Sequence, residues 1–248
     1  MMFLMVVCLS SCRNRPGKKY NSEASGSEQA TSAGSDSEIS TDQQTAGDSD
    51  QTVEDIDGNV YKTVKIGRQT WMAQNLKTTR YNDGTAIPLV TGAAAWSALS
   101  APAYCWYDND SISFQYSYGA LYNGYTVMTH KLCPTNWHVP SDKEWMTLIK
   151  HLGGEIEAGY RLRETGTDYW VSPNEGATNE VGFTALPGGL RYQDGSFHDF
   201  GFGGYWWTST ESSDTRAMFR YIDYEYSNVF GFNNHKTNGF SVRCLRDY

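Results

Sequence analysis

The chain has 248 residues, 19% of them charged, and a formal net charge of −8. This length is enough to bury a sizeable core, and the acidic balance argues against nucleic-acid binding, which needs a basic face toward phosphate. Glycine (24 residues), tyrosine (17) and tryptophan (8) are abundant, which favours a turn-rich, largely β architecture over a helical bundle.

A short apolar run, MMFLMVVCLSSC, opens the chain and ends at Cys12. Its last four residues resemble a bacterial lipobox, in which a leucine and two small residues direct cleavage and lipid attachment at the following cysteine. We expect residues 1–12 to be a lipoprotein signal peptide and Cys12 to carry the lipid. The alternatives are an ordinary secretory signal or a buried strand, and the lack of Lys or Arg before the run departs from the lipoprotein pattern.

The membrane attachment that follows from this interpretation is by lipid. Neither the opening run nor any later segment is long enough to span a bilayer as a helix. A lipid on Cys12 would hold the protein in the bacterial cell envelope, at the outer membrane, with the membrane as its first partner.

Residues 13–52 contain almost no large apolar side chain and are dominated by Ser, Thr, Gly, Gln, Asp and Glu. Such a segment cannot bury enough apolar surface to offset its ordering entropy, so we expect a disordered linker. Residues 53–248 contain no second segment of this kind, and we interpret them as a single folded domain.

The domain begins with a segment typical of a β-hairpin, at residues 55–76. Asp57-Gly58 is a turn signal, and three apolar residues at even spacing predict one buried strand face: Val60, Val64 and Ile66. The segment TGAAAWSALSAP, residues 91–102, predicts a short helix with Thr91 as its N-cap.

The strongest helix signal lies after Pro140. Ser141 and Glu144 have the spacing of a capping box, and Gly153-Gly154 provides the stop. The apolar residues between these signals recur at helical spacing: Trp145, Leu148, Ile149 and Leu152. The sequence therefore predicts a helix over about 142–152 with one face on the core.

Residues 153–182 are expected to form a long loop, and short strands follow it. Strand patterns occupy residues 183–201, 205–211, 216–230 and 239–247. In the last of these, period-two alternation puts Phe240, Val242 and Cys244 on the inner face, with Ser241 and Arg243 on the other.

Three cysteines remain outside the leader: Cys105, Cys133 and Cys244. In an exported protein one disulfide is expected, with one thiol left over. We predict that Cys133 pairs with Cys244, which would close a loop of about 110 residues and stabilise the fold by roughly 4–5 kcal/mol. Cys105 would then be a buried thiol in an aromatic strand.

The sequence contains no recognisable metal or catalytic motif. Cys133 and His138 lack two further ligands at zinc spacing, and Asp55, Asp57 and Asn59 lack the Gly and distal Glu of a calcium loop. The other histidines stand alone, at positions 130, 151, 198 and 235. Nucleophile, phosphate-loop and dinucleotide motifs are also missing. We therefore expect no cofactor and no enzymatic activity.

Two segments could contribute to a binding site. Trp206 and Trp207 are adjacent on a strand and must face opposite sides, so either the sheet is covered on both faces or one ring is an exposed platform for a sugar. The loop after Val171 supplies oxygen-bearing side chains, Asn174 and Glu175 first among them, that could hold calcium or sugar hydroxyls. Asn179 and Glu180 follow in the same loop.

Six segments, in chain order, resemble one known family: DIDGNVYKTVKIGRQTWMAQNLKTTRYNDGTAIP, YGALYNGYTV, LCPTNWHVPSDKEW, NEVGFTALPGGLRY, GYWWTSTE and KTNGFSVRCLRD. They are similar to the Fibrobacter succinogenes major paralogous domain, found on exported bacterial proteins and often on lipoproteins. The resemblance covers roughly residues 53–247. It implies an α+β, C-type-lectin-like single domain with short antiparallel strands, two short helices, long loops, and paired N- and C-terminal strands.

The same resemblance bears on function. The related formylglycine-generating enzymes need two nearby active-site cysteines, and the C-terminal region here has only Cys244. Calcium-dependent lectins use a Glu-Pro-Asn type triplet, of which Ser172-Pro173-Asn174 lacks the leading carboxylate. We therefore expect a non-catalytic module that binds an extracellular glycan or a surface protein. A structural envelope or pilus-associated component is the second hypothesis, and an enzyme derived from the same fold is the third.

Overall fold

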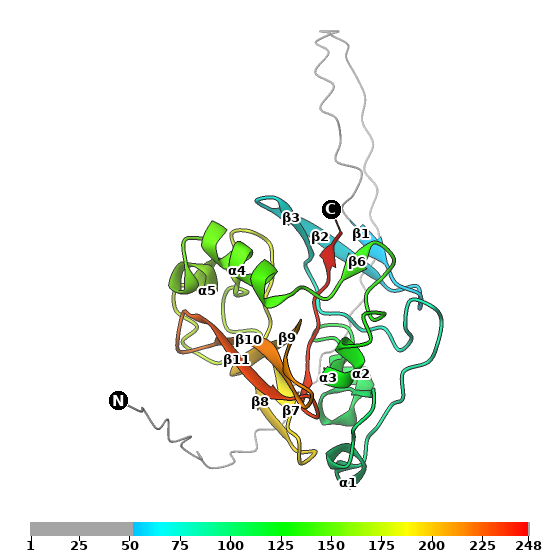
Figure 1. Cartoon of the computed structure of the whole chain (residues 1–248). Coiled ribbons are helices and arrows are strands. Elements are labelled where there is room, and N and C mark those ends of the chain that lie inside the picture. The colour runs from blue at the N-terminus through cyan, green and yellow to red at the C-terminus, as the bar shows by residue number, and fades with distance from the viewer. Residues whose placement is uncertain (1–51, 248) are drawn as a thin grey trace, which may run out of the picture. The chain divides into compact units, whose positions relative to one another are not determined.

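The computed structural model describes residues 52–247, and the predicted signal peptide, Cys12 and all of the predicted linker except Thr52 lie outside this range. The described part is mostly β-sheet with short helices, which confirms the α+β class. Its strands form two sheets (Figure 1). No helix in this range is long and apolar enough to cross a membrane.

The first sheet joins the two ends of the domain. Its order is β1-β2-β3-β13-β6, and the pairing of Leu245 in β13 with Trp71 in β3 is antiparallel, as the family resemblance implied. Figure 1 shows the red C-terminal strand beside the blue and cyan N-terminal strands. The strands of this sheet are β1 (Thr52–Glu54), β2 (Val60–Ile66), β3 (Gln69–Met72), β6 (Trp137–His138) and β13 (Leu245–Arg246).

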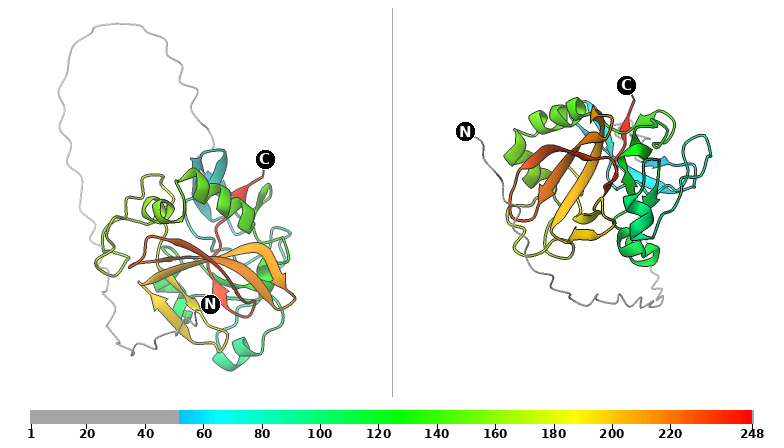
Figure 2. Two further views of the ribbon diagram at one scale, coloured as in Figure 1. Left: turned by 60° about the vertical axis from the view of Figure 1, so that its left-hand side comes forward. Right: turned by 60° about the horizontal axis from the view of Figure 1, so that its bottom comes forward.

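The second sheet has the order β11-β10-β9-β7-β12-β5-β4, with β8 paired to β7. Its long strands β9–β11, drawn in orange to red in Figure 2, are antiparallel neighbours in this sheet. The strands are β4 (Tyr104–Cys105), β5 (Leu121–Asn123), β7 (Gly188–Arg191), β8 (Phe197–Phe200), β9 (Gly203–Ser213), β10 (Arg216–Asp223), β11 (Val229–His235) and β12 (Gly239–Phe240).

The described helices are more numerous than the two predicted. They are α1 (Ala93–Ser97), the 3₁₀ turn η1 (Tyr107–Asn109), α2 (Ser111–Phe114), α3 (Gly124–Val127), α4 (Asp142–His151) and α5 (Glu155–Leu162). The capping box of α4 is confirmed, with hydrogen bonds between Ser141 and Glu144 in both directions. Thr91 does not cap α1, whose N-cap is Gly92 with no side-chain cap bond; the Thr91 carbonyl accepts a hydrogen bond from Arg191.

The helix α5 falls within the segment predicted as a loop. Two glycines with positive φ, Gly153 and Gly154, separate it from α4 and turn the chain. Gly159 lies inside α5 at a point where the helix backbone contacts the carbonyl group of Ser227, leaving no room for a Cβ. The close packing of α5 on the start of β11 therefore explains a glycine that, from sequence alone, argues against a helix.

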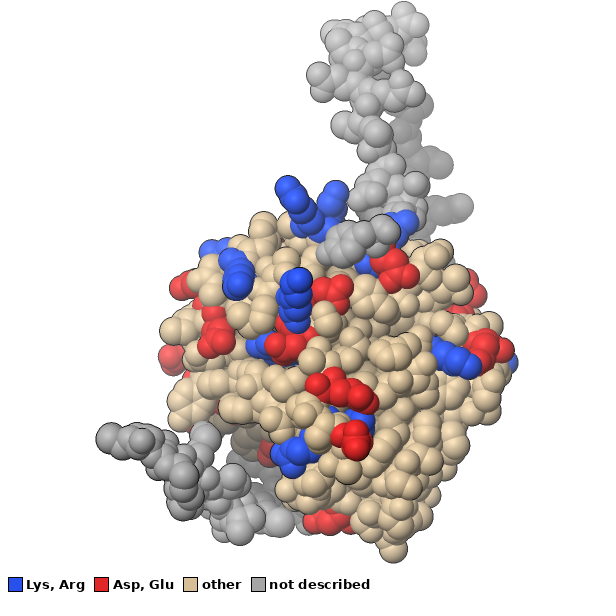
Figure 3. All heavy atoms as spheres, in the orientation of Figure 1, with Lys and Arg blue, Asp and Glu red and all other residues tan. Residues whose placement is uncertain are grey.

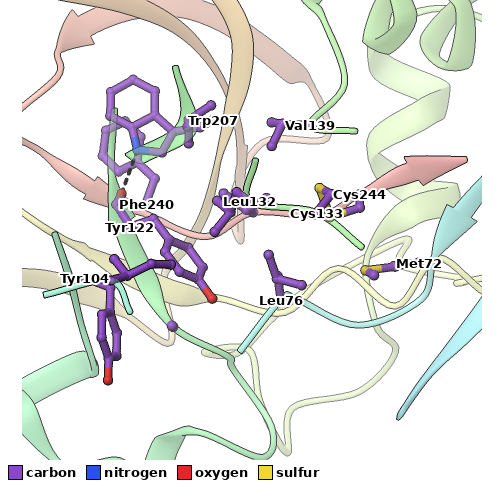
Figure 4. Close-up of a cluster of buried hydrophobic side chains, with 14 of the residues drawn as sticks. Met72, Leu76, Tyr104, Tyr122, Leu132, Cys133, Val139, Trp207, Phe240 and Cys244 are labelled. Carbon is purple, nitrogen blue, oxygen red and sulfur yellow. Dashed lines mark hydrogen bonds between the residues drawn. A yellow bond between two sulfur atoms is a disulfide. The ribbon is translucent and has the colours of Figure 1, made fainter. Parts of the chain in front are cut away.

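Buried side chains form two main cores on opposite faces of β9 and a smaller third cluster. Figure 4 shows part of the first core, where Trp207, Phe240 and Tyr122 pack together and the Cys133–Cys244 disulfide lies near Met72. The second core is formed with α4 and α5, and Trp71, Trp145 and Phe183 contact one another there.

The hairpin prediction is correct in its turn and strands but not in its buried face. Asp57-Gly58 does turn the chain between β1 and β2, with Gly58 at φ 80°. Of the three predicted core residues only Ile66 is buried, whereas Val60 is exposed. Tyr61, on the opposite face, is buried in the first core while Ile66 belongs to the second, because the two ends of β2 contact different cores.

Residues 239–245 are buried on both faces, not on one. Phe240, Val242 and Cys244 lie in the first core as predicted. Ser241 and Arg243 are also buried, because the other side of this segment is covered by Asn75, Phe183 and Thr184, which bond the Arg243 guanidinium. The chain is a strand at β12 (Gly239–Phe240) and again at β13 (Leu245–Arg246).

Candidate ligand-binding site

The two adjacent tryptophans are not a surface platform. Trp206 and Trp207 are both completely buried, so the open alternative is settled in favour of a sheet covered on both faces. The Trp206 indole donates to Asn75 Oδ1 (2.9 Å) on one side, and the Trp207 indole donates to the Tyr122 carbonyl (2.8 Å) on the other. Neither Trp206 nor Trp207 is therefore an exposed platform for a sugar, because each ring belongs to a different core.

More accessible aromatic rings lie next to Trp207, on its own strand and on the two neighbouring strands. Cross-strand pairing aligns Tyr205, Tyr221 and Phe230 in one row, and Trp207, Phe219 and Phe232 in a second row on the same side of the sheet. Centroids of successive rings are 4.6 Å (Tyr205–Tyr221) and 6.0 Å (Tyr221–Phe230) apart. We call these six residues the aromatic face.

The aromatic face runs from the core into solvent. Along the second row Trp207 is fully buried, Phe219 is 6% exposed and Phe232 is 48% exposed. Tyr226, which contacts the Phe230 ring, is 56% exposed. Core packing accounts for the inner rings, but it does not account for large apolar side chains on the outermost strand. These exposed apolar side chains make this side of the sheet a candidate interaction site.

Two carboxylates lie at the end of the tyrosine row. Tyr205 donates its hydroxyl to Asp199 Oδ2 (2.5 Å), and Tyr221 donates to Asp223 Oδ2. Burial, together with the negative charges around the two phenols, raises the pKa of both tyrosines, so each hydroxyl stays protonated. A Cβ on Gly203 would be 2.7 Å from the Tyr221 ring, so only glycine leaves room for this arrangement.

The predicted ligand loop is next to this site but is organised by its own contacts. Asn174 is buried, and its amide donates to the carbonyls of Glu164 (2.9 Å) and Gly166 (2.7 Å). The Glu175 side chain is exposed, while its backbone carbonyl accepts from Arg163.

Arg163 connects that loop to the aromatic face. The same guanidinium donates to the carbonyl of Asp223 (2.8 Å) at the end of β10, so Glu175 and Asp223 are held on either side of one buried arginine. Of the predicted site residues, the structure thus brings Glu175 near the carboxylate end of the face, and it places Asn174 in a supporting role.

The Cys133 and His138 pair is part of the fold. Cys133 and Cys244 form the predicted disulfide, and Cys105 is a buried free thiol. His138 has two partners that the sequence did not reveal, Glu144 at Nε2 (3.0 Å) and Asp247 at Nδ1 (2.5 Å). It therefore ties β6 to the start of α4 and to the C-terminal strand.

The sequence also holds a signal for the aromatic face. Aromatic residues recur with period two in each of three segments, at 205 and 207, at 219 and 221, and at 230 and 232. Period two places each pair on one side of its strand. Only the strand register, however, shows that the three pairs align.

The comparison with known families identifies the chain. The family model described as the Fibrobacter succinogenes major domain matches residues 64–246, and the chain belongs to this family. The match spans both sheets, from β2 to β13. No curated protein and no solved structure matches the chain.

Proposed function

We propose that this protein is a non-catalytic, lectin-like binding module of the bacterial cell envelope, anchored by a lipid on Cys12, and that it binds an extracellular glycan at the aromatic face. The observation that carries the proposal is the run of aromatic rings from the core to the exposed strand β11, with Asp199 and Asp223 bonded to the two tyrosines of the first row. Aromatic rings offer apolar surface to the C–H face of a sugar, and carboxylates accept hydrogen bonds from its hydroxyls.

The charges around the site favour a neutral glycan. The groups bonded to its two phenols are carboxylates, and the chain as a whole carries a net charge of −8. An acidic sugar would meet like charge at this end of the face. The lectin-like part of the proposal is supported by the paired terminal strands β3 and β13 and by the long loops between the short strands.

A glycan array with the full chain tests the proposal. We expect binding to neutral oligosaccharides that persists in the presence of a chelator, because the site consists of rings and phenol-bonded carboxylates. Phe232→Ser should reduce binding at least tenfold, whereas Ile112→Ser, which removes an exposed apolar side chain from α2, should not. Binding to no glycan with and without calcium, or equal loss in both variants, would refute the sugar site.

The second candidate, a structural envelope component, is favoured by a different surface. Between Asp83 and Lys131 the only charged residues are Asp108 and Asp110. Figure 3 shows few charged side chains around α1. In and beside α2, Ile112 and Tyr116 are 86% and 75% exposed. If this surface binds an envelope protein, a stable partner should be retained from envelope extract by the wild-type chain and lost by Ile112→Asp.

A further inference from the structure

The strand β11 is an edge of the second sheet with unusual properties. Among the described strands it pairs only with β10, over seven residues without a register shift. The other edge strands of the two sheets are short or charged: β1 has three residues, β4 and β6 have two each, and β8 has four including Asp199. Short length and charge are the usual protections against pairing with another chain.

None of these protections is present in β11. Its sequence, VFGFNNH, contains no Lys, Arg, Asp, Glu or Pro. The central residues Gly231, Phe232 and Asn233 are all exposed. A long, uncharged, exposed edge strand with aromatic side chains is a template for adding another strand.

The sequence around Gly231 is symmetric in a way that fits a second copy of the same strand. If two β11 strands pair antiparallel about a two-fold axis at Gly231, Phe230 of each copy stands opposite Phe232 of the other. Residues directly opposite in an antiparallel pair lie on the same side of the sheet with Cβ atoms about 4.5–5.5 Å apart. Gly231 meets Gly231 at the axis, and on the opposite side of each sheet the Arg220 guanidinium, bonded to Asp142, lies over this glycine.

The consequence of this register is that the aromatic rows of the two copies become continuous. The row Tyr205–Tyr221–Phe230 of one copy would continue into Phe232, Phe219 and Trp207 of its partner, and the second row would do the same in reverse. Such an interface is isologous, as in most homodimers. It would use the edge of the sheet and leave the inner rings of both copies packed in the first core.

We propose that two copies of this chain pair through β11 in the register centred on Gly231, forming a two-fold dimer in which the aromatic rows of the two copies are continuous. This inference does not depend on glycan binding, because it rests on the strand edge and its symmetry. In such a dimer, a glycan of sufficient length would contact both copies at once.

Analytical ultracentrifugation of the full chain across micromolar concentrations tests the association. We expect a reversible monomer–dimer equilibrium that Phe232→Lys shifts to monomer. Asn233→Glu should have the same effect without altering a ring, and it keeps an acceptor for Arg216, which bonds Asn233 now. The matched control is Phe202→Lys, an exposed phenylalanine outside β11, which should dimerise like the wild type. A monomer at all concentrations, or a dimer insensitive to both β11 variants, would overturn the proposal.

Thiol cross-linking tests the register. In a full chain with Cys8→Ser and Cys12→Ser, a mixture of Phe230→Cys and Phe232→Cys should cross-link to a heterodimer far more than either variant alone, because positions 230 and 232 face each other. Efficient cross-linking of Phe232→Cys by itself would place the axis at position 232 and refute the register at Gly231. No glycan is present in either experiment, so their failure would be distinguishable from failure of the glycan site.

Discussion

At the scale of single residues, buried arginines hold the loops to the sheets. Arg163, Arg191 and Arg243 are nearly inaccessible, yet most of their partners are backbone carbonyls, not carboxylates. The Arg243 guanidinium also lies 4.2 Å from the Phe183 ring centroid. Burial lowers the pKa of Arg243 to about 9, so it is still protonated at neutral pH. A planar cation with five donors can satisfy several loop carbonyls at once.

Replacing Arg243 should therefore be costly even when the charge is kept. We expect Arg243→Lys to lower the free energy of unfolding by about 2–4 kcal/mol, because an ammonium group cannot reach Asn75, Phe183 and Thr184 together and leaves buried acceptors unpaired. Urea denaturation measures the effect. Arg68→Lys, at an exposed position, is the matched control and should change stability by less than about 0.5 kcal/mol. Equal effects in the two variants would show that these contacts contribute little.

Glu144 should make stability depend on acid pH. Burial would raise its pKa, but hydrogen bonds from Ser141 and the proximity of His138 outweigh burial and hold the pKa below the usual 4.5. The unfolded state then binds the proton more readily, so the stabilisation is complete above about pH 4.5 and is lost as pH falls through the lowered folded-state pKa. Thermal denaturation should show a smaller loss between neutral and acid pH in Glu144→Gln than in the wild type. A steeper loss in the variant would contradict this account.

At the scale of secondary structure, α5 offers a test in which packing and helix propensity predict opposite changes in the free energy of unfolding. Gly→Ala within a helix normally stabilises by up to about 1 kcal/mol. At Gly159 the added methyl group would collide with the backbone carbonyl of Ser227, so we expect Gly159→Ala to destabilise the domain. Thr147→Ala, at an exposed position of α4, is the control and should be neutral or slightly stabilising. A stabilised Gly159→Ala would mean that α5 does not pack on β11 as described.

The elements that could be predicted are those whose signals are local. The α4 helix was predicted because Ser141, Glu144 and the apolar spacing lie within a few residues of one another. The sequence does not indicate the α5 helix. The glycine inside it, Gly159, is explained only by a contact with Ser227, which lies 68 positions along the chain. Arg243 was placed on an outer face for the same reason, since the covering side chains come from distant loops.

At the scale of the whole molecule, the disulfide joins the segment before α4 to the closing strand across 111 positions. In the chain-entropy model such a link contributes roughly 4–5 kcal/mol. The double variant Cys133→Ser/Cys244→Ser should therefore have a much lower melting temperature, whereas Cys105→Ser, which breaks no covalent bond, should lose less. Calorimetry of the two variants under identical conditions checks this, and the reverse order would be inconsistent with the assigned pairing.

The binding site could be predicted only in part, and the limit is again one of scale. The sequence correctly indicated aromatic residues on the strand containing Trp206 and Trp207, but it could not show which rings the sheet covers. In the row formed by Trp207, Phe219 and Phe232, the core covers the rings of β9 and β10 and ends before β11. Trp207 is therefore buried and Phe232 is exposed. That boundary is a property of the assembled sheets and leaves no local trace.

The most direct test of the central claim is a calorimetric titration of the best neutral oligosaccharide into the wild type and into Asp199→Asn/Asp223→Asn. These substitutions keep the shape of the site, lie outside β11, and leave asparagine at position 199, where φ is 59° and asparagine is well tolerated. We predict at least a tenfold weaker affinity, about 1.4 kcal/mol, with an unchanged melting temperature. Unchanged affinity in the double variant would contradict glycan recognition at the aromatic face.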